Sequence, residues 1–147
     1  MPLRMVLILI VLILLNSCQS IQTGDSLNKK TISKIREMGL LDDNEKVILY
    51  YSNYQEDKAG NFFTDKRIAH YWLEKNSDSK NDISFAYYRD IISIDTTFKV
   101  HDFDIPYMTV KKRDSTAFKV FIDGSYEQKN AFFTEAINRW KNSRNKK

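Results

Sequence analysis

Short segments with strand character, each bounded by turn residues, constrain the fold of this chain more than any other feature. They are rich in β-branched and aromatic residues, as in Lys46–Ser52 (KVILYYS), and polar runs such as Asn53–Gly60 separate them. The predicted strands span residues 46–52, 61–64, 67–74, 83–88, 91–95, 107–112 and 117–122. Several short strands at regular spacing predict an antiparallel sandwich or barrel rather than a parallel sheet.

A helix is predicted on either side of these strands. Ser125–Gln128 has the form of a capping box, which begins the C-terminal helix. The residues that recur at helical spacing after this box are Phe132, Phe133, Ala136, Ile137 and Trp140. They form one broad apolar face, so we expect this helix to cover an open edge or mouth of the sheet. A shorter amphipathic helix is predicted over Thr31–Leu41, with Gly39 as its stop signal.

The chain begins with a short positive segment and an unbroken apolar run. Arg4 precedes the run, which spans Met5–Leu15, and polar residues follow directly. This pattern is typical of a secretory signal peptide. An uncleaved membrane anchor is the weaker alternative, because a transmembrane helix needs about 20 apolar residues. We therefore predict that residues 1–17 are a signal peptide.

The end of this segment, Leu15-Asn16-Ser17-Cys18, resembles the lipobox of bacterial lipoproteins. The resemblance implies that Cys18, the chain's one cysteine, carries palmitate and other acyl chains that hold the protein in a membrane. Gln19 after the cysteine favours the outer membrane, so we expect a lipid-anchored protein of the bacterial cell envelope. Residues 18–30 are rich in Ser, Thr, Asn, Gln and Lys, which predicts a flexible spacer.

Residues 31–147 have the length and aromatic content of one folded domain. The chain holds nine Phe, eight Tyr and two Trp, enough to form a core without disulfides. The formal net charge is +4, and much of the excess is at the C-terminal end, where basic residues suit the end of a helix. Because the protein is expected outside the cytoplasm, a nucleic acid is not predicted as a partner.

The order of these elements resembles a bacterial pleckstrin-homology-like domain, related to the PH and GRAM domains. The residues that carry the resemblance are Phe63–Ile68 (FTDKRI), which match the strand–turn–strand pattern Thr-Asp-x-Arg-apolar, with Glu45–Val47 and Tyr88–Ile91 in support. It covers roughly residues 40–142. The resemblance implies a mainly β fold, a bent antiparallel barrel of about seven strands capped by the C-terminal helix.

Such a scaffold implies recognition of a peptide, a protein or a lipid. Many PH domains bind inositol phosphates through a basic first loop, but here Glu56 and Asp57 stand against Lys58 alone, so that ligand is not implied. The basic residues in or beside predicted turns form a candidate binding patch for an anionic lipid or an acidic partner. They are Lys66, Arg67, Lys111, Lys112 and Arg113.

The sequence contains no recognisable catalytic pattern. A Gly-x-Ser-x-Gly elbow and a glycine-rich phosphate loop are both missing from it. His101, Asp102 and Asp104 lie close together, but a polar hairpin loop explains them better than a metal site. We therefore predict no catalytic residue, no metal and no cofactor.

The leading hypothesis is a membrane-tethered, non-catalytic module that binds an envelope protein or a lipid headgroup. One alternative is a small envelope hydrolase that uses Asp102 or Asp104. Another is a lipid carrier, which needs an internal cavity on the order of hundreds of Å³.

The lipobox makes one direct prediction. Replacing Cys18 with Ala removes the site of acylation, so we expect the protein to lose incorporated palmitate and to leave the membrane fraction. Metabolic labelling with a palmitate analogue, followed by cell fractionation, measures both effects. A Cys18→Ala protein that is processed and membrane-bound like the wild type would contradict lipid anchoring.

Overall fold

Two antiparallel sheets form the body of the protein in the computed structural model, which describes residues 20–98 and 104–145. The 5-stranded sheet has the order β1-β2-β3-β4-β5 and the 3-stranded sheet the order β6-β7-β8. The strands of the first sheet are β1 (Gln22–Thr23), β2 (Val47–Tyr51), β3 (Ala59–Thr64), β4 (Arg67–Trp72) and β5 (Asp82–Tyr87). Those of the second sheet are β6 (Ile91–Thr97), β7 (Tyr107–Lys112) and β8 (Ala117–Phe121).

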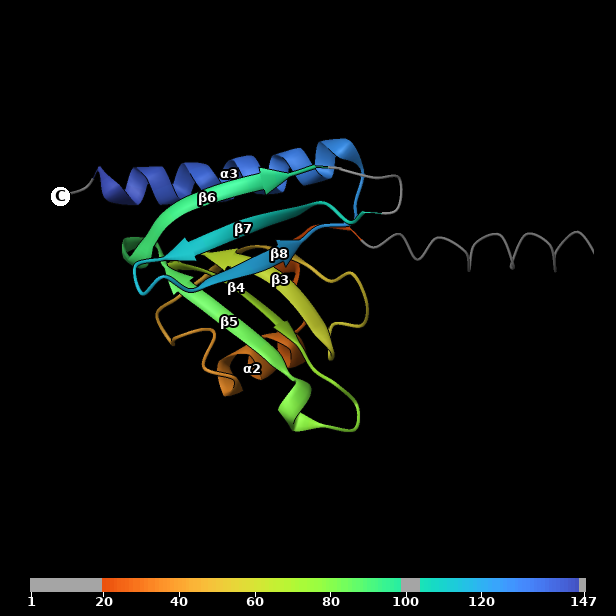
Figure 1. Ribbon diagram of the computed structural model, residues 1–147. Coiled ribbons are helices and arrows are strands. Elements are labelled where there is room, and N and C mark those ends of the chain that lie inside the picture. The colour runs from red at the N-terminus through yellow and green to blue at the C-terminus, as the bar shows by residue number, and fades with distance from the viewer. Residues whose placement is uncertain (1–19, 99–103, 146–147) are drawn as a thin grey trace, which may run out of the picture.

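Two long helices lie on opposite sides of these sheets (Figure 1). They are α2 (Lys29–Glu37) and α3 (Tyr126–Arg144), and short 3-10 turns occur at η1 (Gly24–Ser26), η2 (Asp78–Lys80) and η3 (Tyr88–Asp90). The predicted capping box is present at the start of α3. Gly39 follows α2 with a φ of 72°, a left-handed conformation that favours glycine and ends the helix. No helix in the described ranges is long and apolar enough to cross a membrane.

The expected mainly β fold is confirmed. It differs from the expected barrel in one respect, because the two sheets do not close into a continuous barrel. All the predicted strands are present, and β1 is an additional short strand. Neither sheet continues into the other through strand pairing among the described residues, so the molecule is an open pair of sheets rather than a closed barrel. An open arrangement leaves strand edges unpaired, and such edges matter for binding.

The middle strands of the 5-stranded sheet are buried on both faces, whereas β5 is largely exposed. The inner face of the sheet packs against the second sheet and α3 in a core that contains Tyr51, Phe63, Ile68, Ala86, Tyr88, Ile91, Met108, Val110, Phe118, Val120, Ile122, Phe132, Phe133, Ala136 and Trp140. Its outer face packs under α2 in a second core that contains Leu27, Ile35, Leu40, Leu41, Val47, Tyr50, Phe62, Ala69 and Tyr71. Burial on both faces explains why β3 and most of β4 are buried at every position.

Part of the predicted spacer over residues 18–30 is folded against the domain. Within that range β1 pairs with β2, and α2 begins at its end. The carboxylate of Glu56 accepts hydrogen bonds from Gln22 Nε2 at 2.6 Å, Asn28 Nδ2 at 2.9 Å and Thr31 Oγ1 at 2.7 Å. These contacts fasten the segment to the loop between β2 and β3. The predicted signal peptide and Cys18 lie outside the described residues.

A buried ion pair lies between α2 and the outer face of the sheet. Arg67, the first residue of β4, is 1% exposed. Its Nε donates to Glu45 Oε1 at 2.9 Å and its Nη2 donates to Glu45 Oε2 at 2.5 Å, which is the bidentate geometry of a strong pair. Thr64 Oγ1 at the end of β3 also donates to Glu45 Oε1. The pair therefore joins β3, β4 and the loop after α2.

The rest of the guanidinium is also enclosed. Its Nη1 donates to Gly39 O at 3.1 Å, and Asp42 Oδ2 lies 2.8 Å from Nη2. The rings of Phe85 and Tyr87 on β5 lie over it, with centroids 4.9 and 4.4 Å from Cζ. Burial lowers the pKa of Arg67, but its hydrogen bonds to the two carboxylates more than offset this and raise it. The side chain is therefore a buried, paired cation.

Removing this cation should destabilise the fold strongly. Arg67→Met keeps much of the apolar stem but leaves the Glu45 carboxylate buried without its partner, which costs about 3–5 kcal/mol. Urea unfolding of the full chain in mild detergent, monitored by tryptophan fluorescence, measures the loss in the free energy of unfolding.

The matched control is the half-exposed pair on α3, in which Glu135 Oε1 lies 2.7 Å from Arg139 Nε. Glu135→Gln should change the free energy of unfolding by less than about 0.5 kcal/mol. Equal effects of the two substitutions would show that the buried pair does not hold the sheet to the α2 segment.

Candidate functional site

β5 forms a free edge of the 5-stranded sheet. Among the described strands β5 pairs with β4 alone. Tyr88 N, directly after β5, donates to Lys66 O at 3.0 Å, so this amide faces the β4 side. Because successive residues of a strand direct their backbone groups to alternate sides, the N–H and C=O groups of Ile83, Phe85 and Tyr87 face away from β4.

The hydrogen bonds between β4 and β3 lead to the same assignment of inward and outward groups on β5. Leu73 N, directly after β4, donates to Lys58 O at 2.7 Å, so the odd-numbered residues of β4 bond towards β3. The even-numbered ones then bond to the even-numbered residues of β5. An edge with outward N–H and C=O groups is a template on which another extended chain can add as a strand.

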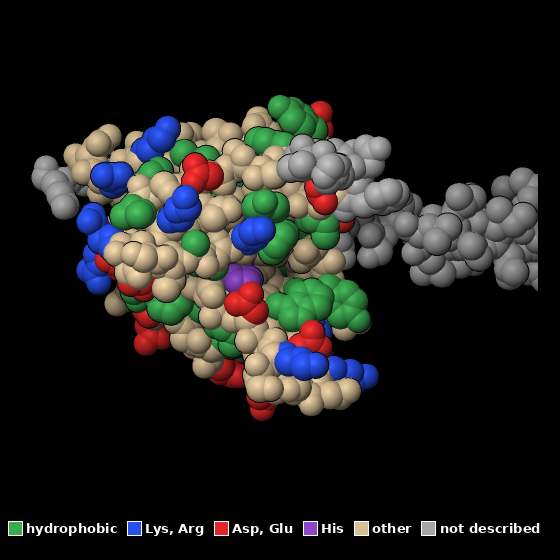
Figure 2. All heavy atoms as spheres, in the orientation of Figure 1, with side chains coloured by type: hydrophobic (Ala, Val, Ile, Leu, Met, Phe, Trp, Pro, Cys, Tyr) green, Lys and Arg blue, Asp and Glu red, His purple; other side chains and the backbone are tan. Residues whose placement is uncertain are grey.

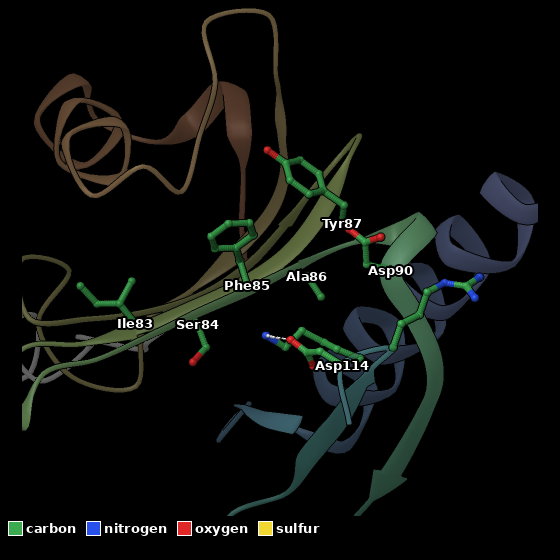
Figure 3. A pocket seen from close by; sticks show the side chains of 9 residues that line it. Ile83, Ser84, Phe85, Ala86, Tyr87, Asp90 and Asp114 are labelled. Atoms are coloured by element: carbon green, nitrogen blue, oxygen red, sulfur yellow. Dashed lines mark ion pairs between the residues drawn. The ribbon is translucent and has the colours of Figure 1, made fainter. Parts of the chain in front are cut away.

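A groove of about 520 Å³ runs along this edge. It is lined by Ile83, Ser84, Phe85, Ala86, Tyr87, Asp90, Lys112, Arg113 and Asp114. Figure 3 shows Ile83, Phe85 and Tyr87 pointing to one side of β5 and Ser84 and Ala86 to the other. Ile83 is 42% exposed and Phe85 is 37% exposed, a high value for large apolar side chains.

The far wall of the groove, which is the turn between β7 and β8, carries balanced charges. Lys112 Nζ lies 3.6 Å from Asp114 Oδ2, the pair drawn as a dashed line in Figure 3. Hydrogen bonds from the side chain and the backbone of Thr116, together with Lys112, lower the pKa of Asp114. Arg113 Nε donates to Arg89 O at 2.9 Å. The groove therefore offers polar partners of both signs rather than a concentrated positive charge.

The structure divides the predicted basic patch, and Arg67 does not belong to it. Its register on β4 directs the side chain under the aromatic rings of β5, where carboxylates compensate the charge. Lys112 and Arg113 line the β5 groove, whereas Lys111 is exposed on β7 outside its lining. Lys66 lines a different groove beside Arg89. The remaining basic residues thus do not meet in one place.

The residues considered for catalysis offer no assembled centre in the part of the chain that is described. His101 and Asp102 lie outside the described residues, and Asp104 is exposed. Residues 20–98 and 104–145 contain no group of three or more His, Cys, Asp or Glu side chains that could hold a metal ion. The space between the two sheets holds the inner core, so aromatic and aliphatic side chains occupy the region where a lipid carrier needs its cavity.

The edge groove was not anticipated from the sequence. The sequence predicted a strand over residues 83–88, in which the large residues Ile83, Phe85 and Tyr87 alternate with the small residues Ser84 and Ala86. This alternation also distinguishes the two faces of the strand, because the small residues face the core. Which edge of the sheet stays open depends on the order of the strands, which residue types do not reveal.

Comparison with known proteins supports the fold. No protein-family model and no curated protein matches the sequence. The chain is similar to a solved structure, the crystal structure of a DUF1696 family protein with a pleckstrin-homology domain from Shewanella loihica PV-4. The TM-score is 0.52 and the identity 13%, and the alignment covers 85% of this chain and 96% of that one. At this identity the likeness concerns the fold alone: the chain has a pleckstrin-homology-like fold.

Proposed function

We propose that this protein is a membrane-tethered, non-catalytic binding module that holds an extended segment of another envelope protein against the free edge of β5. The single observation that carries the proposal is this edge, where outward backbone groups at Ile83, Phe85 and Tyr87 meet an open groove. Main-chain hydrogen bonds to an added strand supply affinity, and the exposed side chains of Ile83 and Phe85 supply apolar contact.

A protein segment suits the groove better than an anionic lipid headgroup. Recognition of phosphate groups relies on clustered cations, preferably arginine. Here Arg67 is buried in its own ion pair, and Lys112 lies beside Asp114. The mixture of carboxylates, cations and exposed apolar side chains is typical of a surface that binds a polypeptide. The pleckstrin-homology-like fold is itself typically a non-catalytic binding module, which agrees with this role.

The predicted anchor and the groove are compatible in space. Residues between Cys18 and β1 span at most about 14 Å, since an extended chain covers about 3.5 Å per residue. β1 and β5 are the two opposite edges of the same sheet. Four strand spacings of about 4.8 Å separate them by roughly 19 Å. A tether at the β1 edge thus leaves the β5 edge accessible to a partner, and tethering raises the effective concentration of a weak binder.

The proposal is tested by crosslinking in living cells. A photoreactive amino acid replaces Arg113 on the groove wall of the full chain, and the adducts are identified by mass spectrometry. The substitutions Ile83→Ala and Ile83→Pro are then compared. Both remove most of the isoleucine side chain, but only proline also removes the outward N–H. Proline is tolerated at such an edge position, since the lost N–H does not bond to β4.

We expect one protein adduct that survives Ile83→Ala and falls at least about fivefold with Ile83→Pro, since one hydrogen bond contributes about 1 kcal/mol. The same photoreactive group at Tyr126, which is exposed at the start of α3, is the positional control and should not capture this protein. A lipid adduct in place of a protein, or an adduct that both Ile83 variants retain equally, would contradict binding by strand addition.

A further inference from the structure

A second, smaller pocket lies where β3, β4 and β8 meet the start of β5, and it shares no lining residue with the β5 groove. Its volume is about 200 Å³. The lining residues are Asn53, Ala59, Asn61, His70, Tyr71, Trp72, Asp82 and Phe121. This volume is below the about 300–1,000 Å³ of sites for drug-sized ligands, so the pocket suits a single small ring.

An unsatisfied histidine forms part of this pocket. His70 is 6% exposed, and its ring stacks on Phe118 at a centroid distance of 5.7 Å with planes 10° apart. Within the described part of the chain, its Nε2 makes no hydrogen bond of good geometry. Asp82 Oδ1 lies 3.3 Å from this nitrogen, so a neutral ring with its proton on Nε2 donates to it only weakly, and a protonated ring forms an ion pair with it. A buried polar atom without a well-aligned partner costs up to about 1–3 kcal/mol, so a ligand hydroxyl group that bonds to Nε2 is favoured.

The charge state of His70 limits which chemical groups a ligand can present to it. Burial lowers the pKa of His70, and the nearby Asp82 carboxylate opposes this without reversing it. The ring is therefore neutral at neutral pH, and its Nε2 can exchange a hydrogen bond with a hydroxyl group. Lysine and arginine are absent from the pocket lining, which disfavours an anion, and Asp82 is its one carboxylate, which disfavours a metal ion.

Two amides form the polar side of the pocket. Asn61 Oδ1 accepts a hydrogen bond from Phe121 N at 3.1 Å, which ties β3 to β8. Its Nδ2 donates to Asn53 Oδ1 at 3.4 Å. Asn61 is buried and held by both contacts, so these polar groups are positioned before any ligand arrives.

An exposed aromatic side chain forms the other side. Trp72 is 40% exposed, and its ring lies beside Tyr54 with centroids 5.9 Å apart. Its Nε1 donates to Glu74 Oε1 at 2.9 Å, which fixes the plane of the indole. Figure 2 shows a histidine side chain in a hollow of the surface between an acidic side chain and a group of hydrophobic ones. A flat apolar ring beside fixed polar groups matches a ligand with one apolar face and a hydroxylated edge.

We propose that this pocket binds a neutral pyranose ring of a glycan. The C–H face of the sugar lies on Trp72, because the electron-rich face of an indole attracts weakly positive C–H groups. The sugar hydroxyls donate to Asp82 and bond to Asn53, and one of them satisfies His70 Nε2. Asp82 is exposed at the mouth of the pocket, so it has room to turn towards the ligand. The site does not depend on the proposed β5 partner and goes beyond it.

The two tryptophans provide the test. The full chain is labelled with ¹⁵N in a detergent without a sugar headgroup and titrated with glucose and with N-acetylglucosamine. Trp72 lines the pocket, whereas Trp140 is buried and donates through Nε1 to Ile91 O, so its indole signal reports only that the fold is intact. We expect the Trp72 indole signal to shift saturably, with a Kd of about 1–10 mM, while that of Trp140 stays in place.

Two carboxylates on the same stretch of chain give matched variants. Asp82→Asn should weaken binding about tenfold, since it removes a charged acceptor of sugar hydroxyls. Asp78→Asn, at an exposed position in η2, should leave the affinity within about twofold. The proposal is overturned if neither sugar shifts Trp72 at about 50 mM, or if the two variants bind alike. Shifts confined to Ile83–Tyr87 would overturn it as well, because they would assign the sugar to the other groove.

Discussion

The ion pair between Arg67 and Glu45 is the interaction on which the arrangement of the 5-stranded sheet depends. A buried guanidinium is tolerated only when its hydrogen bonds are satisfied, and here two carboxylates and the carbonyl of Gly39 satisfy it. These acceptors come from the segment after α2, while the cation comes from β4. The pair thus fixes the position of the outer helix on the middle strands of the sheet, which are buried on both faces.

This constraint extends to the edge of the sheet. Phe85 and Tyr87 lie over the guanidinium, so the side chains of β5 are packed against a rigid centre while its backbone edge stays open. A fixed edge strand costs less conformational entropy when a partner adds to it than a mobile one does. At the opposite edge, Glu56 fastens the segment that follows the predicted lipid anchor. The proposal therefore assigns attachment to one edge of the sheet and binding to the other.

The sequence predicted the elements better than it predicted their exposure. Strand and cap signals are local, so the segments around Phe63–Ile68 and the capping box at Ser125 were predicted correctly. Arg67 follows a polar turn, and arginine is rarely fully buried, so its place in a surface patch was the natural but wrong interpretation. The docking of Asn28 on Glu56 joins residues far apart in the chain, and no local pattern reveals such contacts. The free β5 edge likewise follows from strand order alone.

The most direct test of the binding account is amide hydrogen exchange along β5. It is measured by NMR on the full chain, with and without the protein captured by crosslinking at Arg113. Without the partner, the outward amides of Ile83, Phe85 and Tyr87 should exchange quickly, and those of Ser84 and Ala86 should exchange slowly. With the partner bound, the three outward amides should become protected in the same alternating pattern. Protection that appears elsewhere, or outward amides that are already protected in the free protein, would contradict strand addition at this edge.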